Sequence, residues 1–218
     1  MHRKLVVRFL SAWQVGSGLG DGYLADSQVN RDHDGLPWLP GRAIKGALRE
    51  AAWRLGGCRE DLRKAENIFF GGRNRQGADE VSRAQGLMHI APGYLCQSVR
   101  QAYRCLGAAE RDDFVQDMLC HRVQTALDDG RRVVNGSLRT LECGMPGLEF
   151  ESGIDLALPD SISEDWAASY LAALCAGVKS MGGNRSRGLG RCQFVLEGVG
   201  AGPVRMPAPW TAGMGGVA

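Results

Sequence analysis

Apolar residues recur along the chain with two different periods, which predicts a mixture of strands and helices. Alternating apolar positions predict strands at residues 4–9, 87–90, 121–126, 148–158 and 191–199. Helical spacing predicts helices from Arg42 to Gly56, at 60–68 and at 164–178, the last with a wide apolar face. Residues 93–120 have no clear period, and we expect a helix there only after Ala108.

The clearest elements follow the order strand, helix, strand, strand, helix, strand, with long inserts between them. This is the order of the ferredoxin-like, or split βαβ, arrangement. We therefore expect an α+β fold in which residues 1–199 form one domain. Beyond Gly200 the composition is mainly Gly, Pro and Ala, so residues 200–218 are expected to form a poorly ordered tail.

Glycine accounts for 31 of the 218 residues, roughly twice its usual ~7 % share. The glycines have no G-X-Y period, which excludes a collagen, and a hydrophobic content of 44 % is too high for a disordered chain. They gather at 16–22, 71–72, 182–190 and 198–202, which indicates loops whose backbone turns tightly or approaches another group closely. Residues 16–35 also carry four aspartates and no apolar period, so we expect a long exposed loop there, and a loop of this length in a compact domain is usually functional or disordered.

The charge balance limits where an anionic partner can bind. The net charge of +2 gives no global polybasic signature, so any anion-binding surface must be local. The apolar run at the N-terminus is interrupted by Arg8 before it reaches the length of a signal peptide. The longest uncharged apolar stretch, residues 166–178, is shorter than the ~18 residues of a membrane span. We therefore expect no membrane association.

Seven cysteines without a CxxC pair favour a reducing compartment, so we expect a cytoplasmic protein. The candidates for a zinc site are Cys96, Cys105, Cys120 and His121. Their spacing lacks the paired cysteines around which structural zinc sites are built. Buried thiols without a metal are therefore the expectation.

The most distinctive motif is the segment 182–191, which contains four glycines, three arginines and no acidic residue. Glycine lets backbone N–H groups approach a ligand, and the arginine guanidinium matches the geometry of a phosphate. The segment lacks the GxxxxGK[ST] pattern, so a nucleotide-binding P-loop is not supported. We expect this loop to bind phosphate groups; the alternative is an ordinary helix-to-strand connection with solvated arginines.

A second basic motif, PGRAIKG at residues 40–46, lies at the start of a predicted helix. Free N–H groups at a helix N-terminus favour anions, and Arg42 and Lys45 add positive charge there. Arg49 lies on the same predicted helix face. Taken alone, the motif fits a solvated basic face better. Beside the loop at 182–191, binding of backbone phosphate becomes the stronger interpretation.

Together and in this order, these motifs resemble the signature of the RAMP (repeat-associated mysterious protein) superfamily of CRISPR systems. The matching segments are LPGRAIKG at 39–46, IFFGG at 68–72 and GGNRSRGLG at 182–190. Residues 139–150, with Glu142 and a GMPG turn, resemble the end of a thumb-like hairpin in the repeating backbone subunit of type III (Csm/Cmr) effector complexes. The resemblance covers nearly all of residues 1–198. It implies a modified ferredoxin-like (RRM-like) fold with long inserts and a thumb-like hairpin at about 122–147.

This resemblance implies a specific function. Subunits of this branch line up with copies of themselves and with other effector subunits along a CRISPR RNA. They cut the target RNA with an aspartate in the loop before the Pro-Gly helix and with a divalent metal. The matching aspartate is Asp26, which would hold Mg²⁺ or Mn²⁺. The residues implied in RNA binding are Arg42, Lys45, Arg49, Arg131, Arg132, Gly183, Asn184, Arg185, Arg187, Gly188, Gly190 and Arg191.

The resemblance also gives roles to the thumb. Arg131 and Arg132 would follow the RNA backbone, and residues 133–134, both valine, would wedge at a displaced base. Glu142 would assist cleavage. The alternative for Arg131 and Arg132 is a solvated hairpin tip without an RNA contact.

Alternatives to cleavage at Asp26 remain open. Asp26 alone fits a local Asx turn, and the competing carboxylates of the same loop are Asp21, Asp32 and Asp34. The chain could be a purely structural CRISPR RNA-binding subunit. It could also be a metal-independent CRISPR RNA-processing endoribonuclease with His33 as general base. A phosphate-binding metabolic enzyme is the residual alternative.

Overall fold

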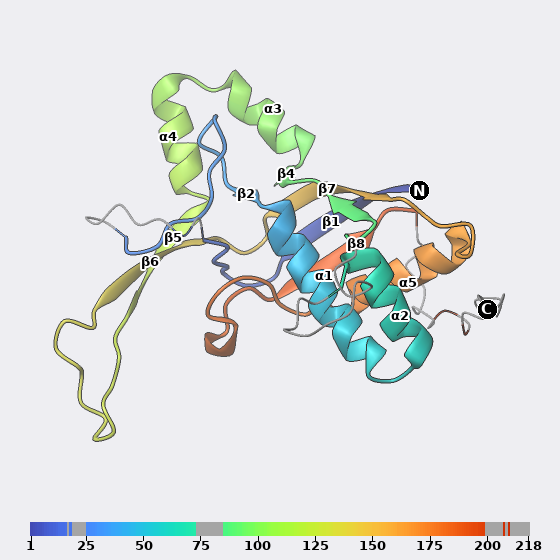
Figure 1. The fold of residues 1–218 in the computed structure, drawn as a ribbon. Coiled ribbons are helices and arrows are strands. Elements are labelled where there is room, and N and C mark those ends of the chain that lie inside the picture. Colours follow the sequence, from blue (N-terminus) through green and yellow to red (C-terminus); the bar gives the residue numbers. More distant parts are fainter. Residues whose placement is uncertain (17, 19–24, 73–84, 199–206, 208, 210–218) are drawn as a thin grey trace.

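The fold is described from a computed structural model of the chain, drawn in Figure 1. The structure describes residues 1–16, 18, 25–72, 85–198, 207 and 209. Asp21 and most of the predicted tail at 200–218 lie outside these residues. Within them, the expected mixture of helices and antiparallel strands is confirmed.

A six-stranded antiparallel sheet forms the centre of the molecule. Its strands are β1 (His2–Phe9), β2 (Trp38–Leu39), β3 (Met88–Ile90), β4 (Gly93–Leu95), β7 (Glu149–Leu156) and β8 (Cys192–Leu196). They follow the order β2-β4-β7-β1-β8, and β3 also pairs with β7. Alternation along β1 turns Leu5, Val7 and Phe9 to one face, where all three are fully buried. The predicted strands at both ends of the chain are therefore confirmed.

Three helices cover the buried face of this sheet: α1 (Gly41–Gly56), α2 (Glu60–Phe70) and α5 (Glu164–Gly177) (Figure 1). Their apolar residues recur at helical spacing, so that Ile44 and Leu48 of α1 and Leu171 and Leu174 of α5 are fully buried. Each buried side chain of this size contributes roughly 1.5–3 kcal/mol. All three predicted helices are confirmed. None of the described helices is long and apolar enough to cross a membrane.

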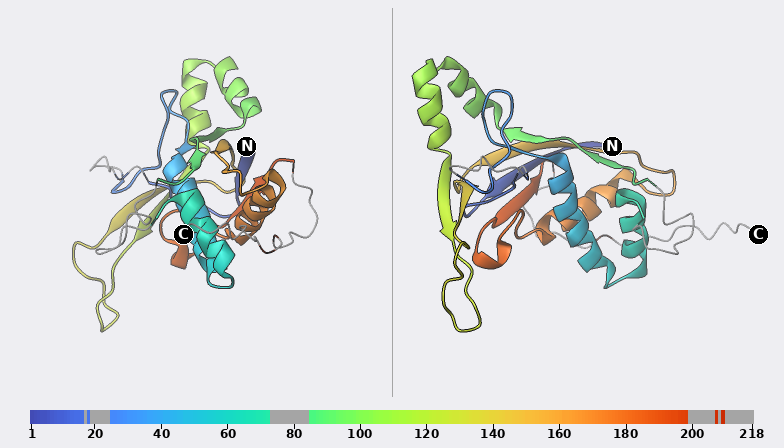
Figure 2. Two further views of the ribbon diagram at one scale, coloured as in Figure 1. Left: turned by 45° about the vertical axis from the view of Figure 1, so that its right-hand side comes forward. Right: turned by 60° about the vertical axis from the view of Figure 1, so that its left-hand side comes forward.

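The opposite face of the sheet is polar. Lys4 pairs with Glu151 at 3.1 Å, and Arg8 pairs with Glu149 at 2.6 Å. Beyond the edge of the sheet formed by β2 and β4, α3 (Gln97–Cys105) and α4 (Ala108–Gln116) project as a helical pair (Figure 2). The helix expected after Ala108 is confirmed. The sequence did not predict α3, which is short and buries only Tyr103, with Val99 partly buried beside it.

A two-stranded ribbon, β5 (Leu119–Gln124) paired with β6 (Arg139–Gly144), extends away from the main sheet (Figures 1 and 2). It overlaps the hairpin expected at about 122–147. Trp13 joins the ribbon to the core, because it stacks on Phe9 at 4.6 Å and exchanges backbone hydrogen bonds with Gly144. A Cβ at Gly144 would lie 2.1 Å from the Trp13 ring, so only glycine fits at this joint.

Candidate nucleic-acid interface

A groove of about 860 Å³ separates the root of the ribbon from the loop that precedes β8. The ribbon side consists of Gln124, Thr125, Ala126, Ser137, Arg139 and Leu141. The loop side consists of Ser180, Gly182, Asn184, Arg185, Ser186 and Arg187. None of these lining residues is acidic, and three are arginines. A polar groove with this charge suits the phosphate backbone of a nucleic acid.

The loop at 182–191 owes most of its glycines to packing against the protein itself. A Cβ at Gly190 would lie 2.1 Å from the carbonyl oxygen of Met181, and one at Gly182 would lie 2.4 Å from the carbonyl oxygen of Gln14. Gly183 is equally restricted by the side chain of Gln14. Gly188 differs, because its φ of +82° favours glycine while a Cβ placed on it would meet no atom of the described residues within 4 Å. Gly188 is thus the glycine of this loop whose surroundings could admit a ligand.

The arginines of this loop reach in two directions. Arg185 Nη1 lies 2.7 Å from Glu50 Oε2 on α1, and Arg187 Nη1 donates to Gln124 Oε1 at the end of β5. Arg187 therefore spans the groove from the loop to the ribbon. Arg191 is exposed, while its backbone N–H donates to Ser11 Oγ. Arg185 and Arg187 thus line one groove with Arg139 of β6, which sequence reasoning did not single out, whereas Arg191 does not line it.

Asp26 lies on the outer edge of β6. Its backbone N–H donates to the Thr140 carbonyl at 2.8 Å, and the Thr140 N–H donates to Asp26 Oδ2 at 2.7 Å. The bridge between Ser27 and Leu141 is parallel, so this segment continues the ribbon as a short third strand. Asp26 is exposed, and its carboxylate is bound by a distant strand in place of the local Asx turn.

Glu142 anchors the same segment from the inside. Its side chain is only about 5 % exposed, and its two oxygens accept from Val29 N–H at 3.0 Å and from Arg31 Nη2 at 2.5 Å. Val29 is itself buried, as are Ala25 and Asn30, so the expectation of an exposed loop is wrong for these three residues, although it holds for Asp26. The reason is that this segment pairs with β6, which no local pattern reveals. Glu142 therefore holds the loop that carries Asp26.

Gln14 connects the two loops, and no local pattern points to this residue. It is 7 % exposed, and its Nε2 donates to Ser27 Oγ at 2.6 Å. Its Oε1 accepts from Asn184 Nδ2 at 3.2 Å, and its carbonyl accepts from the Gly183 N–H at 2.8 Å. The loop of Asp26 and the loop of the arginines are therefore fixed relative to each other through one buried amide.

The predicted basic residues of α1 differ in their surroundings. Arg42 is exposed near the start of the helix. Lys45 Nζ donates to the Met88 carbonyl at 2.6 Å, and partial burial, assisted by the charge of Arg49, lowers the pKa of Lys45. Arg49 Nη2 donates to the Gly71 carbonyl at 2.6 Å. These contacts bind Lys45 and Arg49 to the protein, and their RNA contacts stay a prediction.

The tip of the ribbon presents the predicted thumb residues to solvent. Arg131 and Arg132 are exposed, as are the valines at 133 and 134. The turn is held by Asp128, whose Oδ1 accepts from the Arg132 N–H at 2.8 Å. Two exposed arginines and two exposed valines thus lie side by side on this turn, at the position where the sequence predicts RNA contact.

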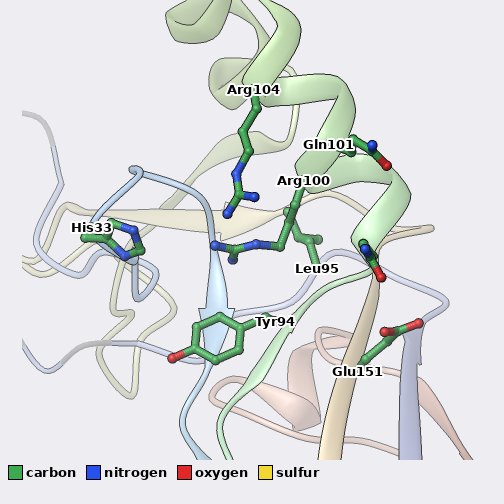
Figure 3. Close-up of a pocket in the computed structure, with 8 residues that line it drawn as sticks. His33, Tyr94, Leu95, Arg100, Gln101, Arg104 and Glu151 are labelled. Carbon is green, nitrogen blue, oxygen red and sulfur yellow. The ribbon is translucent and has the colours of Figure 1, made fainter.

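His33 lines a second cavity of about 560 Å³, between α3 and the polar face of the sheet, and two of the competing aspartates, Asp32 and Asp34, contact Arg100 of its lining. Figure 3 shows His33 on one side of it, Arg100 and Arg104 entering from α3, and Tyr94 below them. Arg100 pairs with Asp32 at 2.7 Å and with Asp34 at 3.3 Å. The ligand atoms of residues 32–34 lie within 4.8 Å of one another, but Arg100 already neutralises both carboxylates. His33 does not line the groove of the arginines.

The cysteine candidates do not form one cluster along the fold. Cys96 precedes α3 and Cys105 ends it, whereas Cys120 lies in β5, where it pairs with Cys143 across the ribbon. Every described cysteine is a free thiol. Burial raises the pKa of Cys143 to about 11, so this thiol stays protonated at neutral pH.

Comparison with known proteins relates this arrangement to a family. A family model described as the RAMP superfamily matches residues 6–193. No curated protein matches the sequence. Among solved structures, the chain is similar to a chain of type III-B Cmr-beta in the apo state, with a TM-score of 0.66 and 13 % identity over 91 % of this chain and 98 % of that one. It is also similar to a chain of type III-B Cmr-beta bound to cognate target RNA, with a TM-score of 0.67 and 12 % identity over 90 % and 97 % of the two chains. At these identities the likeness is one of fold.

Proposed function

This chain belongs to the RAMP superfamily, and on that premise we propose that it is a CRISPR RNA-binding backbone subunit of a type III effector complex that cuts target RNA at Asp26. The observation that carries the proposal is the position of Asp26. It is tied by two hydrogen bonds to Thr140, the residue next to Arg139 of the groove. The Asp26 carboxylate is thereby held on the same ribbon as Arg139, which lines the groove.

The proposal includes a modified ferredoxin-like, RRM-like fold. The chain order β1-α1-β3-β7-α5-β8 and the strand order β3-β7-β1-β8 correspond to a split βαβ arrangement. The helical pair α3–α4 and the ribbon β5–β6 are then inserts between β4 and β7. The ribbon is the thumb in this interpretation. Similarity to chains of type III-B Cmr-beta supports it.

CRISPR RNA would lie in the groove with its phosphates against Arg139, Arg185 and Arg187. Guanidinium groups pair with phosphate oxygens through two parallel hydrogen bonds, and such contacts supply affinity without reading sequence. Further contacts would come from Arg42, Lys45, Arg49, Arg131, Arg132, Gly183, Asn184, Gly188, Gly190 and Arg191. A guide of any sequence could be held in this way, which suits a subunit that lines up with copies of itself along one RNA.

Asp26 supplies the carboxylate that the proposed cleavage needs. Thr140 holds Oδ2, while Oδ1 has no hydrogen-bond partner among the residues that the structure describes. Magnesium and manganese ions bind commonly through one or two carboxylates, with phosphate oxygens and water as the remaining ligands. Asp26 beside an RNA phosphate fits such an ion. When bound, the ion would neutralise the charge that develops on the phosphate during cleavage.

The RNA itself supplies the nucleophile in this proposal. Its 2′-oxygen forms a bond to the adjacent phosphorus, the bond from phosphorus to the 5′-oxygen breaks, and the hydroxyl proton passes to solvent while the leaving oxygen takes one up. The products are a 2′,3′-cyclic phosphate and a 5′-hydroxyl. The protein's part is to hold the strand and the Asp26 carboxylate in one geometry.

Cleavage of guide-complementary RNA by the assembled complex tests the proposed function. We expect a discrete small RNA to purify with the complex, and we expect cutting that stops when EDTA removes divalent metal. Cutting that persists in EDTA and is lost in His33→Ala would support the RNA-processing alternative. The position of His33 in the other cavity argues against that alternative. If the complex bound RNA but did not cut it, the alternative of a purely structural RNA-binding subunit would be supported.

A further inference from the structure

The cavity between α3 and the polar face of the sheet is lined by polar side chains that the fold itself does not use. Gln97, Gln101 and Arg104 line it from α3, and their spacing of three to four residues places them on one side of the helix. Within the part of the chain that the structure describes, these three side chains make no hydrogen bond or ion pair. The cavity volume of about 560 Å³ falls within the ~300–1,000 Å³ of small-molecule sites.

His33 faces α3 from a turn that is fixed to that helix. The residues on both sides of His33 bind Arg100, which pairs with Asp32 at 2.7 Å and with Asp34 at 3.3 Å. Tyr103 Oη also donates to the Asp34 carbonyl at 2.6 Å. The His33 side chain is 80 % exposed, and its Nε2 lies 3.4 Å from Asp34 Oδ1. An exposed imidazole is therefore held in a fixed position opposite α3.

Arg104 carries the positive charge of this cavity that no carboxylate of the described residues balances. Figure 3 shows its side chain pointing into the cavity, toward His33 and the guanidinium of Arg100. Arg100 has two carboxylate partners, and Glu151, the acidic residue of the lining, pairs with Lys4 at 3.1 Å. Like charges four residues apart on a helix repel each other. An anion bound between His33 and Arg104 would relieve this repulsion.

We propose that this cavity binds a terminal phosphate group, the phosphomonoester of a nucleotide, between Arg104 and His33. The Arg104 guanidinium can donate two parallel hydrogen bonds to phosphate oxygens. The His33 ring has an N–H donor whether it is neutral or charged. The amides of Gln97 and Gln101 offer both donors and acceptors, which suit the base edge and the ribose hydroxyls of the same ligand.

The proposed site is separate from the RNA groove, because the cavity and the groove share no lining residue. A phosphomonoester carries a charge of about −1.5 to −2 at neutral pH, more than the single charge of a phosphodiester inside a strand. Two convergent cationic groups on a fixed frame therefore suit a terminal phosphate. Such a phosphate belongs either to a free mononucleotide or to the phosphorylated end of an RNA strand, and the two sources are distinguished by experiment.

Equilibrium dialysis of the full chain with radiolabelled AMP tests the site. We expect a Kd on the order of 0.1 mM for the wild type. Arg104→Gln removes the charge and should weaken AMP binding about 10-fold or more. Adenosine, which lacks the phosphate, should bind the wild type about 10-fold more weakly than AMP. Arg63→Gln, at an exposed arginine of α2, is the matched control and should bind AMP like the wild type.

Thermal unfolding separates loss of binding from loss of folding. The Arg104 side chain is exposed and unpaired in the described chain, so Arg104→Gln should have the wild-type Tm when no ligand is present. AMP should raise the Tm of the wild type and leave that of Arg104→Gln unchanged. Arg187→Gln, which alters the groove, should bind RNA more weakly while it keeps the wild-type affinity for AMP.

Fluorescently labelled RNA 12-mers that differ only in a 5′-phosphate or a 5′-hydroxyl distinguish the two sources, with affinity measured by anisotropy. If the phosphorylated oligomer binds the wild type more tightly but both bind Arg104→Gln equally, the ligand is a strand end. If the oligomers bind alike while AMP binding depends on Arg104, the ligand is a free nucleotide. AMP binding that Arg104→Gln leaves unchanged, or that Arg187→Gln abolishes, would overturn the proposal. Both results leave cleavage at Asp26 as a separate question.

Discussion

Asp26 and Thr140 are joined by two hydrogen bonds, one in each direction: the Asp26 N–H donates to the Thr140 carbonyl, and the Thr140 N–H donates to Asp26 Oδ2. The pairing attaches a residue of a long loop to a strand of the ribbon. The position of the carboxylate is therefore set by β6, and not by the conformational freedom of the loop. Residues that act on a bound strand require such fixed placement, because small displacements reduce catalysis strongly.

The buried carboxylate of Glu142 should control this placement. Glu142→Ala leaves the Val29 N–H and Arg31 without their partner, so we expect the free energy of unfolding to fall by about 2–3 kcal/mol. Glu142→Gln keeps a neutral acceptor for the Val29 N–H, so its free energy of unfolding should fall by about half as much. Both variants should bind RNA but cut it slowly, since the segment of Asp26 is released. Urea denaturation and a cleavage assay measure the two effects.

The control for Glu142 is Glu197→Ala, which removes an exposed carboxylate from the polar face of the sheet. Surface ion pairs contribute little, so this variant should match the wild type within about 0.5 kcal/mol. If Glu142→Ala were as stable as Glu197→Ala and cut at the normal rate, Glu142 would not position the loop.

Two glycines of the loop at 182–191 should respond differently to the same substitution. Gly190→Ala places a Cβ 2.1 Å from the Met181 carbonyl oxygen at a φ of +75°, so we expect a loss of about 2–4 kcal/mol. Gly188→Ala adds the left-handed strain alone and should lose about 1 kcal/mol. Thermal unfolding of both variants measures the difference. If both variants lost the same stability, the close contact between Gly190 and the Met181 carbonyl would not constrain this position.

The arginines of the groove should set the salt dependence of RNA binding. Each guanidinium that contacts a phosphate releases counterions, so Arg139→Ala and Arg187→Ala should each reduce the slope of log K against log salt by about 0.7–1. Arg63→Ala, an exposed arginine on α2, is the control and should leave the slope unchanged. Binding of the labelled RNA at several salt concentrations gives these slopes. Identical slopes in all three variants would place the RNA elsewhere.

Local patterns were sufficient to predict the main elements and the arginine loop. The alternation of Leu5, Val7 and Phe9 gives β1, and the spacing of Ile44 and Leu48 gives α1, because burial of one face determines both. Helix α3 escaped prediction since it is short and buries only Tyr103. Part of its anchoring comes from long-range ion pairs such as Arg100–Asp32, which leave no periodic pattern in the sequence.

The geometry of the site depends on long-range pairing that a single sequence does not reveal. Asp26 meets Thr140, and Gln14 meets Asn184, across large separations along the chain. The glycines of the loop at 182–191 also show what a single sequence does not reveal. Their number suggests that they admit a ligand, yet at Gly182 and Gly190 a side chain would clash with the protein's own backbone. Only the folded chain distinguishes a glycine that packs from one, such as Gly188, that faces open space.

The most direct test of the account is cleavage of guide-complementary RNA by complexes that carry Asp26→Asn. The asparagine oxygen can still accept from the Thr140 N–H, so the segment should stay in place while the negative charge and the metal-binding capacity are lost. Asp129→Asn, at the exposed tip of the same ribbon, is the matched control. We predict that the Asp26→Asn complex assembles with its RNA and binds target normally but cuts at least about 100-fold more slowly, while Asp129→Asn cuts like the wild type. Cutting by Asp26→Asn at the wild-type rate would contradict the central claim.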